Sequence, residues 1–263
     1  MTNKPLTLDI DQRGVATICM NNPEKHNAFD ETVISELTSL FEKIGKNDQA
    51  KIMILRSNGK NFSAGADLDW MKRMATNEYN DNVRDANALA KMLHTLNFLN
   101  IPTIARVQGA AMGGGAGLVC CCDIAIATSK ASFAFSEAKL GLIPATIAPY
   151  VLQSIGSQAA RRYFLTAERF DAERALALGM VSEVVDESEI DEKIAGLIDI
   201  LLTNSFEAVK AAKKLIFDID GKPVKKKLMK MTSKRIADIR ASEEGIEGLA
   251  AFLDKRKPSW VEE

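Results

Sequence analysis

The sequence has few of the residues from which metal and redox sites are built. It contains two histidines, His26 and His94, and four cysteines, three of them adjacent at positions 120–122. We expect this run on a strand, where neighbouring side chains point to opposite faces, so it is neither a disulfide framework nor a zinc motif. We therefore expect small buried cysteines in a reducing cytoplasm and no histidine-rich metal site.

Long apolar runs and an excess of one charge are absent as well. No apolar segment approaches the ~20 residues that span a bilayer, and the first residues lack the basic-then-apolar pattern of a signal peptide. Lys and Arg number 34 and Asp and Glu number 35, which gives a net charge of −1. We expect a cytoplasmic protein without a membrane or polyanionic partner.

Strand and helix patterns alternate over the first part of the 263-residue chain. Strand composition occurs at 14–22, 51–57, 101–109 and 122–128. One helical stripe follows a capping residue, Asp30; its members are Val33, Leu37, Leu40, Phe41 and Ile44. A second stripe consists of Ala86, Leu89, Ala90, Leu93 and Leu96. This alternation predicts an α/β protein with helices packed over a sheet.

The pattern changes after about residue 155. Two short helices are predicted over 156–180, the second ending at Gly179, and a short strand over 181–186. Residues 189–254 are almost wholly helical in pattern. No linker separates the two parts, so we expect a core over 1–190 and a helical C-terminal region over 191–263 within one domain.

Two segments rich in small residues, "GKNFSAGADLDWM" (59–71) and "GAAMGGGAGL" (109–118), each follow a predicted strand and enter a predicted helix. Backbone N–H groups at such junctions can bind an anion. The alternative is two tight turns whose glycines serve geometry alone. A dinucleotide fingerprint, a P-loop and a G-x-S-x-G nucleophile elbow are all missing, which argues against those three classes.

Taken in order, six segments resemble the crotonase (enoyl-CoA hydratase/isomerase) superfamily along nearly the whole chain. They are "NNPEKHNAFD", "FSAGADL", "GAAMGGGAG…CDIAIA", "FSEAKLGLIP", "ALALGMVSEVV" and "EGLAAFLDKRKP". The resemblance implies a crotonase-type α/β spiral of ββα turns with a helical C-terminal trimerisation region, as a homotrimer or a dimer of trimers. It also implies an acyl-CoA thioester substrate, with coenzyme A as part of that substrate and neither a metal nor another cofactor.

The resemblance assigns an oxyanion site to two backbone N–H groups, those of Ala66 and Gly114. Removing a proton beside a thioester, or adding water to the conjugated alkene, puts negative charge on the thioester oxygen. Preorganised donors stabilise that charge, and the loss of one costs about 10²–10³ in rate. On this interpretation the glycines of the run let the thioester approach the backbone closely.

The resemblance also implies a set of residues at the CoA and substrate site: Ala64, Leu68, Gly113, Gly117 and Lys255. Ala64, Ala66 and Leu68 would surround the adenine end of CoA, which Lys255 would reach. For Lys255 the alternative is an ordinary solvated chain end. The basic stretch 222–235 has two interpretations as well, a contact with CoA phosphates or the solvated face of a helix.

Family hydratases typically use two glutamates, and this sequence keeps only the later one, Glu137. Its spacing from Phe133 and Phe135 predicts that it faces an apolar interior, where a raised pKa would let it transfer a proton near neutral pH. The earlier position is Gly117. Three interpretations follow. In the first, Glu137 both orients water and protonates Cα in hydration, with the second role taken by a substrate group, a bound water molecule or an unidentified residue. In the others, the protein is a Δ3,Δ2-enoyl-CoA isomerase or binds acyl-CoA without catalysis.

Further segments, among them "GLIPATIAPYV" and "ARRYFLTAERF", are most similar to bacterial methylglutaconyl-CoA hydratases. The resemblance implies reversible syn-type hydration of 3-methylglutaconyl-CoA in leucine degradation. That substrate carries a second carboxylate, for which Lys139, Arg161 and Arg162 are the candidate cations.

A eukaryotic relative in that group binds AU-rich RNA through a lysine-studded helix. The matching stretch 82–99 holds only Arg84 and Lys91 as strong cations. Because phosphate contacts dominate nucleic-acid affinity, we expect no nucleic-acid partner.

Overall fold

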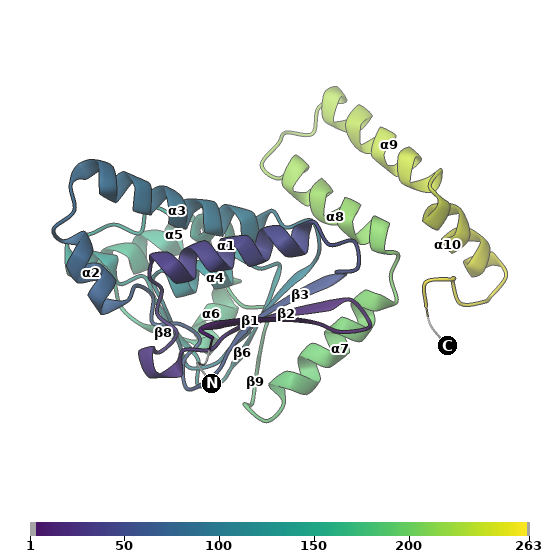
Figure 1. Ribbon diagram of the computed structural model, residues 1–263. Helices are drawn as coiled ribbons and strands as arrows, with labels where there is room; N and C mark the ends of the chain where they lie inside the picture. The colour runs from purple at the N-terminus through teal and green to yellow at the C-terminus, as the bar shows by residue number, and fades with distance from the viewer. Residues whose placement is uncertain (1–3, 262–263) are drawn as a thin grey trace.

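A mixed sheet of six strands forms the centre of the computed structural model, which describes residues 4–261 (Figure 1). In spatial order its strands are β1 (Leu6–Ile10), β2 (Val15–Met20), β3 (Ile52–Ser57), β4 (Thr103–Val107), β6 (Ile124–Thr128) and β9 (Glu183–Val185). β1 pairs antiparallel with β2, and every other pair of neighbours is parallel. Each predicted strand region contains one of these strands.

A second, smaller sheet gives the chain its spiral course. Its strands are β5 (Ala110–Met112), β7 (Ser132–Ala134) and β8 (Phe170–Asp171). After β4 the chain crosses to β5, and after β6 it crosses to β7, so that one turn stacks on the next in parallel at both sheets. An isolated bridge between Ser63 and Ala111 extends the stack to the turn that follows β3. This stacking is the spiral of ββα turns that the resemblance implies.

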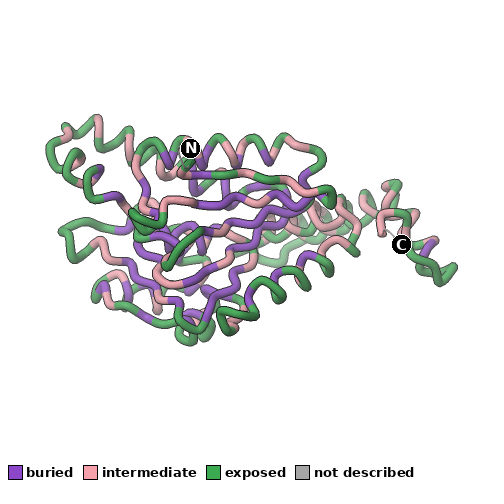
Figure 2. Tube along the Cα trace, turned by 60° about the horizontal axis from the view of Figure 1, so that its bottom comes forward, coloured by how far each residue is buried: buried purple, intermediate pink, exposed green. Residues whose placement is uncertain are grey.

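Helices cover both faces of the large sheet (Figures 1 and 2). They are α1 (Glu31–Gly45), α2 (Leu68–Met74), α3 (Tyr79–Asn97), α4 (Gly114–Cys121), α5 (Ala148–Thr166), α6 (Ala172–Leu178) and α7 (Ile190–Leu202), with short 3₁₀ helices η1 (Pro23–Lys25) and η2 (Glu137–Leu140). The main core lies on the α1, α3 and α4 side. On the opposite face, Ile190, Ile194 and Ile198 of α7 pack against apolar residues of β2, β3, β4 and β6.

Helix α1 forms where its apolar spacing predicts it. The Asp30 carboxylate accepts a hydrogen bond of 2.9 Å from the Val33 N–H, which satisfies a donor of the first turn. Leu37 and Phe41 are fully buried. Helix α3 is different, because only its C-terminal half reaches the core and Tyr79 at its start is exposed. The apolar spacing in the sequence therefore predicts this helix correctly, but it overestimates how much of the helix is buried.

The run of cysteines lies on a helix, so the prediction of a strand there is wrong. Cys120 and Cys121 end α4, and Cys122 is its C-cap. All four cysteines are unpaired, and burial raises the pKa of Cys120 to about 12. The apolar residues 118–121 are compatible with a buried helix as well as with a strand. The length of the segment distinguishes the two, but only when both of its ends are known.

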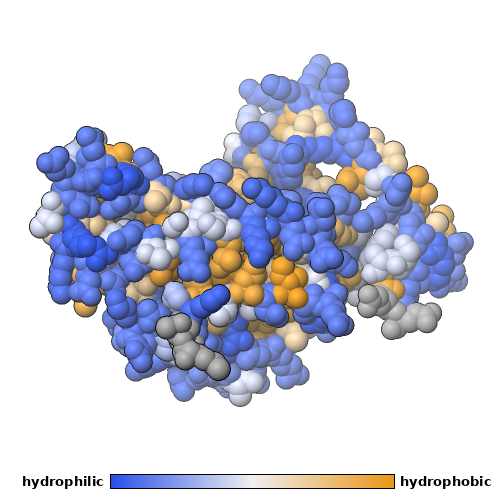
Figure 3. Space-filling model, in the orientation of Figure 1, coloured by the Kyte–Doolittle hydropathy of each residue, from blue (hydrophilic) through white to orange (hydrophobic). Residues whose placement is uncertain are grey.

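The C-terminal helices α8 (Phe206–Ile219), α9 (Lys226–Arg240) and α10 (Glu243–Leu253) extend away from the sheets (Figure 1). We call these three helices and the segments that connect them the arm. Lys213 attaches it to the core, because its ammonium group lies 2.6 Å from the Asp123 carboxylate and donates to the Ile101 carbonyl. Hydrophobic residues lie open along the arm (Figure 3); they include Ile216, Val224, Met229, Ile236, Ile246, Leu249, Phe252 and Leu253. Within residues 4–261, every helix is too short or too polar to cross a membrane.

Candidate functional site

The first small-residue segment forms a turn held on both sides by backbone hydrogen bonds. Phe29 donates its N–H to Gly65 and accepts from the Asp67 N–H, both at 2.7 Å, so it brackets Ala66. In such a parallel bridge the bracketed residue directs its own N–H away from the partner segment. The Ala66 N–H thus points away from Phe29, and in the part of the chain that the structure describes it has no assigned acceptor.

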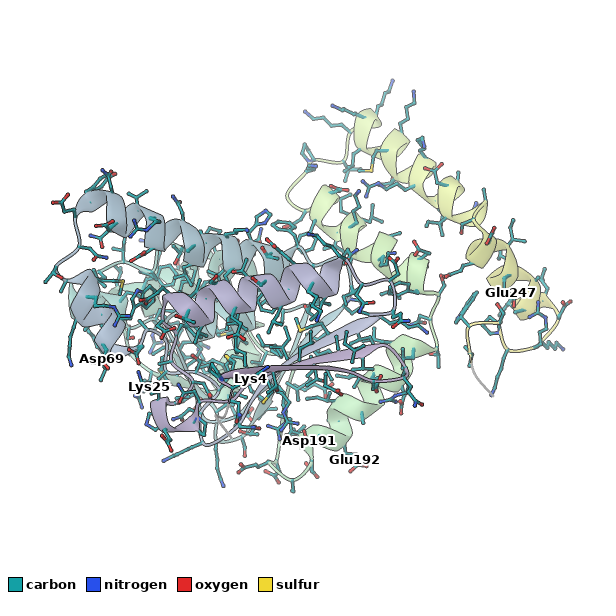
Figure 4. The ribbon with its side chains drawn as sticks, viewed as in Figure 1. Lys4, Lys25, Asp69, Asp191, Glu192 and Glu247 are labelled. Carbon is teal, nitrogen blue, oxygen red and sulfur yellow. The ribbon has the colours of Figure 1, made fainter. Side chains whose placement is uncertain are left out.

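Asp67 fixes the start of the helix behind this turn. Its buried carboxylate accepts hydrogen bonds from the N–H groups of Asp69 and Trp70, as an N-cap does. The same carboxylate lies 2.9 Å from the Lys25 ammonium, which holds the pKa of Asp67 below its usual range. Figure 4 shows Lys25 and Asp69 together below α2. An Asp just before a helix is an N-cap signal that the sequence displays at this position.

The second small-residue segment turns from β5 into α4 at Gly113. Gly113 has φ +51°, a conformation that favours glycine. Gly114 is the first residue of α4, so its N–H belongs to the helix start and has no acceptor within the helix. A Cβ at Gly114 would lie 2.8 Å from the Phe29 ring, and one at Gly115 would lie 2.8 Å from the Ser63 Cβ.

The two turns are joined directly. Ser63 donates its N–H to Ala110 and accepts from the Met112 N–H, and a Cβ at Gly65 would lie 2.8 Å from the Met112 carbonyl oxygen. These contacts bring the Ala66 turn beside the Gly114 turn. Close packing within the protein therefore accounts for Gly65, Gly114 and Gly115, where the resemblance suggests the approach of a substrate.

Glu137 lies beside the glycine turn. One of its carboxylate oxygens, Oε1, is 3.2 Å from the place that a Cβ at Gly113 would take. The other, Oε2, is buried and has no hydrogen-bond partner among the described residues. Burial raises the pKa of Glu137. A carboxyl group in this state can exchange a proton with a molecule bound at the turn.

The orientation of Glu137 does not come from strand alternation. Strand β7 ends at Ala134, and Phe133, Ala134 and Phe135 are all buried. Glu137 instead begins η2, so the 3₁₀ turn directs its side chain. The prediction that Glu137 faces an apolar interior agrees with its burial. The reason for that prediction, alternation along a strand from Phe133 and Phe135, is wrong.

The other predicted residues lie at different distances from this centre. Gly117 is buried in α4, one turn after Gly113, and Ala64 and Leu68 are exposed on either side of Ala66. Lys255 is exposed and follows α10 on the arm, which lies away from the two turns in this single chain. Near Lys255, Arg256 pairs with Glu247 at 2.7 Å and lowers the pKa of Glu247 to about 2.

Of the three candidate cations for a substrate carboxylate, Lys139 follows Glu137 by two residues in the chain. It lies on η2, the same 3₁₀ helix, and is exposed. Arg162 already binds Glu168 at 2.7 Å, and Arg161 is exposed on α5. Among the three, Lys139 is therefore the one that shares an element with Glu137.

The stacked ββα turns and the two facing backbone turns define an α/β protein of the crotonase fold. The sequence model of the enoyl-CoA hydratase/isomerase family matches residues 11–263. The chain belongs to this family.

Individual relatives agree with this. An enoyl-CoA hydratase structure from Shewanella pealeana is 47% identical, with a TM-score of 0.94, and covers 98% of this chain and 97% of that chain. A short-chain-enoyl-CoA hydratase of Clostridium acetobutylicum is 31% identical over 251 residues, 92% of each chain. Human enoyl-CoA hydratase domain-containing protein 3, a mitochondrial protein, is 30% identical over 253 residues, covering 95% of this chain and 82% of that protein.

The burial of Glu137 predicts a pH-dependent effect of Glu137→Gln on stability. Because its pKa is higher in the folded than in the unfolded chain, the folded state keeps the proton longer, and stability falls as pH rises from the unfolded pKa to the folded one. The melting temperature of the variant minus that of the parent should therefore increase between about pH 4 and about pH 8. Thermal denaturation over this range measures the difference, with Glu36→Gln on α1 as the control. A difference independent of pH would contradict the desolvation of Glu137.

Proposed function

We propose that this protein adds water reversibly, in a syn-type reaction, across the α,β double bond of an enoyl-CoA, and that its substrate is 3-methylglutaconyl-CoA of leucine degradation. The observation that carries the proposal is the position of Glu137. It is a half-buried carboxyl group with one unpartnered oxygen, beside the first turn of α4. Coenzyme A enters as part of the substrate, so we propose no separate cofactor.

In this proposal the thioester oxygen accepts hydrogen bonds from the N–H groups of Ala66 and Gly114. The joined turns support it, because neither donor has an assigned protein acceptor within residues 4–261 and both belong to backbone fixed by other contacts. Donors fixed before the reaction stabilise the charge that develops on the oxygen without reorganising, which is the condition under which they contribute most.

Glu137 moves the proton. Its carboxylate takes a proton from water while the water oxygen bonds to Cβ and the electron pair of the double bond moves toward the thioester oxygen. The resulting enolate then takes the same proton from Glu137 at Cα. A single carboxyl group lies on one face of the substrate, so the hydroxyl group and the proton arrive on that face and the addition is syn. Atoms and charge balance without a metal or a redox step.

A second candidate function is Δ3,Δ2-enoyl-CoA isomerisation. The observation that favours it is Gly117, a buried position without a side chain one turn from Gly113. Glu137 would take a proton from Cα and return it at Cγ, while the double bond moves from Cβ–Cγ to Cα–Cβ. No water is consumed, and one carboxyl group suffices.

Two substitutions test the proposed roles. Glu137→Gln keeps the size of the side chain and removes the base, so kcat for hydration should fall about 10²–10⁴-fold. Ala66→Pro removes an N–H that the bridge to Phe29 does not use, and kcat should fall about 10²–10³-fold. Loss of the absorbance of the conjugated enoyl thioester gives the rates, and circular dichroism checks that the fold is kept. Unchanged turnover in Glu137→Gln would end the assignment of Glu137.

The choice of substrate is tested with two enoyl thioesters. The parent protein should hydrate 3-methylglutaconyl-CoA faster than crotonyl-CoA. Lys139→Ala should raise KM about fivefold for the dicarboxylic substrate only, as expected for an exposed ion pair of about 1 kcal/mol. Arg161→Ala is the control. Equal effects of Lys139→Ala on both substrates would remove Lys139 as the partner of the second carboxylate.

We also propose that the arm joins copies of this chain into a trimer or a pair of trimers. Its support is the open hydrophobic surface of the arm, since an isolated chain rarely exposes so many large apolar residues on adjoining helices. Phe252 on α10 is 81% exposed and Leu253 is 75% exposed. Contact with a neighbour would cover both.

Sedimentation of the arm variants tests this assembly. The parent should sediment as three or six chains of 28.7 kDa each. Phe252→Asp should shift the mass toward one chain, because a charge would be buried at the contact. Tyr79→Asp is a matched control, since Tyr79 is 80% exposed at the start of α3, outside the arm. A single-chain mass for the parent would contradict the proposal.

A further inference from the structure

Two glycines at the start of α4 meet different neighbours. Gly113 is the N-cap of α4, and Gly117 lies one turn further along the chain, inside the helix. Oε1 of Glu137 stands outside Gly113, 3.2 Å from the place of a Cβ there. Outside Gly117 stands Ile147: a Cβ at Gly117 would overlap its Cγ2 and lie 3.1 Å from its Cβ. The carboxylate thus stands beside the N-cap of α4, and the isoleucine stands beside the turn that follows it.

A side chain at position 117 would extend toward Glu137. Side chains of an α-helix lean toward its N-terminus, over the turn that precedes them. For position 117 that turn is the one containing Gly113, where the Glu137 carboxylate lies. The methyl group of Ile147 therefore fills the space through which a second polar side chain would approach the carboxylate.

Ile147 is held firmly in this place. It is 1% exposed, and its carbonyl accepts hydrogen bonds from the N–H groups of Tyr150 and Val151 at the start of α5. Its branched Cβ leaves few side-chain rotamers, so Cγ2 cannot swing aside cheaply. The Cδ2 atom of Leu93 bounds the same space at 3.6 Å.

We infer that Ile147 is a specificity-determining residue for the reaction, because it keeps both a second carboxylate and an additional water molecule away from Glu137. Glu137 then has to perform every proton transfer alone. Hydration needs a positioned water molecule, whereas double-bond migration needs only the carboxylate. Ile147 consequently sets the ratio of hydration to isomerisation. This inference rests on the proposed function only for the role of Glu137.

The packing part of the inference is tested by stability. Gly117→Ala should lower the melting temperature in the parent and lower it much less in an Ile147→Ala background, since neighbouring residues couple. Gly196→Ala in α7 is the matched control, because a Cβ at this helical glycine meets nothing within 4 Å. Its effect should be the same in both backgrounds. Equal losses for Gly117→Ala in both backgrounds would overturn the inference.

The chemical part is tested by the ratio of two rates, hydration of crotonyl-CoA and isomerisation of a 3-enoyl-CoA. The double variant Gly117→Glu with Ile147→Ala should raise this ratio about tenfold, or ~1.4 kcal/mol, over Gly117→Gln with Ile147→Ala, which matches its size without the charge. Ile147→Ala alone should also raise the ratio, because the space that it opens borders a carboxylate and can hold water.

The outcomes separate this inference from the proposed function. Should Glu137→Gln leave turnover unchanged, the proposed function fails, while the stability comparison still tests the packing of Ile147. If instead Glu137→Gln abolishes activity but all three Ile147 variants keep the parent ratio, the proposed function stands and the role of Ile147 is wrong. If the double variant Gly117→Glu with Ile147→Ala does not fold, the rate ratio of Ile147→Ala alone tests the role of Ile147 in the same way.

Discussion

The hydrogen-bonded contact between two successive chain turns at Ser63 supports the whole site. Ser63 is fully buried, and its backbone bonds to Ala110 and Met112 while its hydroxyl group donates to Asn27. Three segments that are distant in the sequence therefore meet at one residue. Because this contact sets the separation of the two turns, it also sets where the Ala66 and Gly114 N–H groups stand. The surrounding sheets and helices act as a frame that keeps this contact dry and fixed.

Much of the fold follows from the sequence, because strand and helix periods are local signals. The strands around 15–20 and 52–57 and the helix after Asp30 are where their composition predicts them. Local signals fail where tertiary contacts decide. The cysteine run is apolar enough for either state, and only its position after the glycine turn makes it the end of α4. The 3₁₀ helix that orients Glu137 is only four residues long, which is too short to produce a hydrophobic periodicity in the sequence.

The residue types of the candidate site follow from the sequence, but the physical reasons for their presence follow less well. The resemblance to a family points to Glu137 and the two small-residue turns as a candidate site, and the glycines suggest close approach by a ligand. The structure attributes several of these glycines to the protein's own packing, against Phe29, Ser63 and Met112. Ile147 gave no signal at all, since one isoleucine in an apolar stretch looks like any other core residue. Its importance comes only from what stands opposite it in space.

The two edges of the large sheet have a consequence for aggregation. β1 forms one edge and carries a charged residue, Asp9, near its end, while β9 forms the other and is only three residues long. On β9, Glu183 also pairs with Lys193 of α7 at 2.6 Å. Short or charged edges resist the addition of a foreign strand. Two chains thus have little tendency to associate by pairing their edge strands. The exposed apolar surface of the arm is more prone to association.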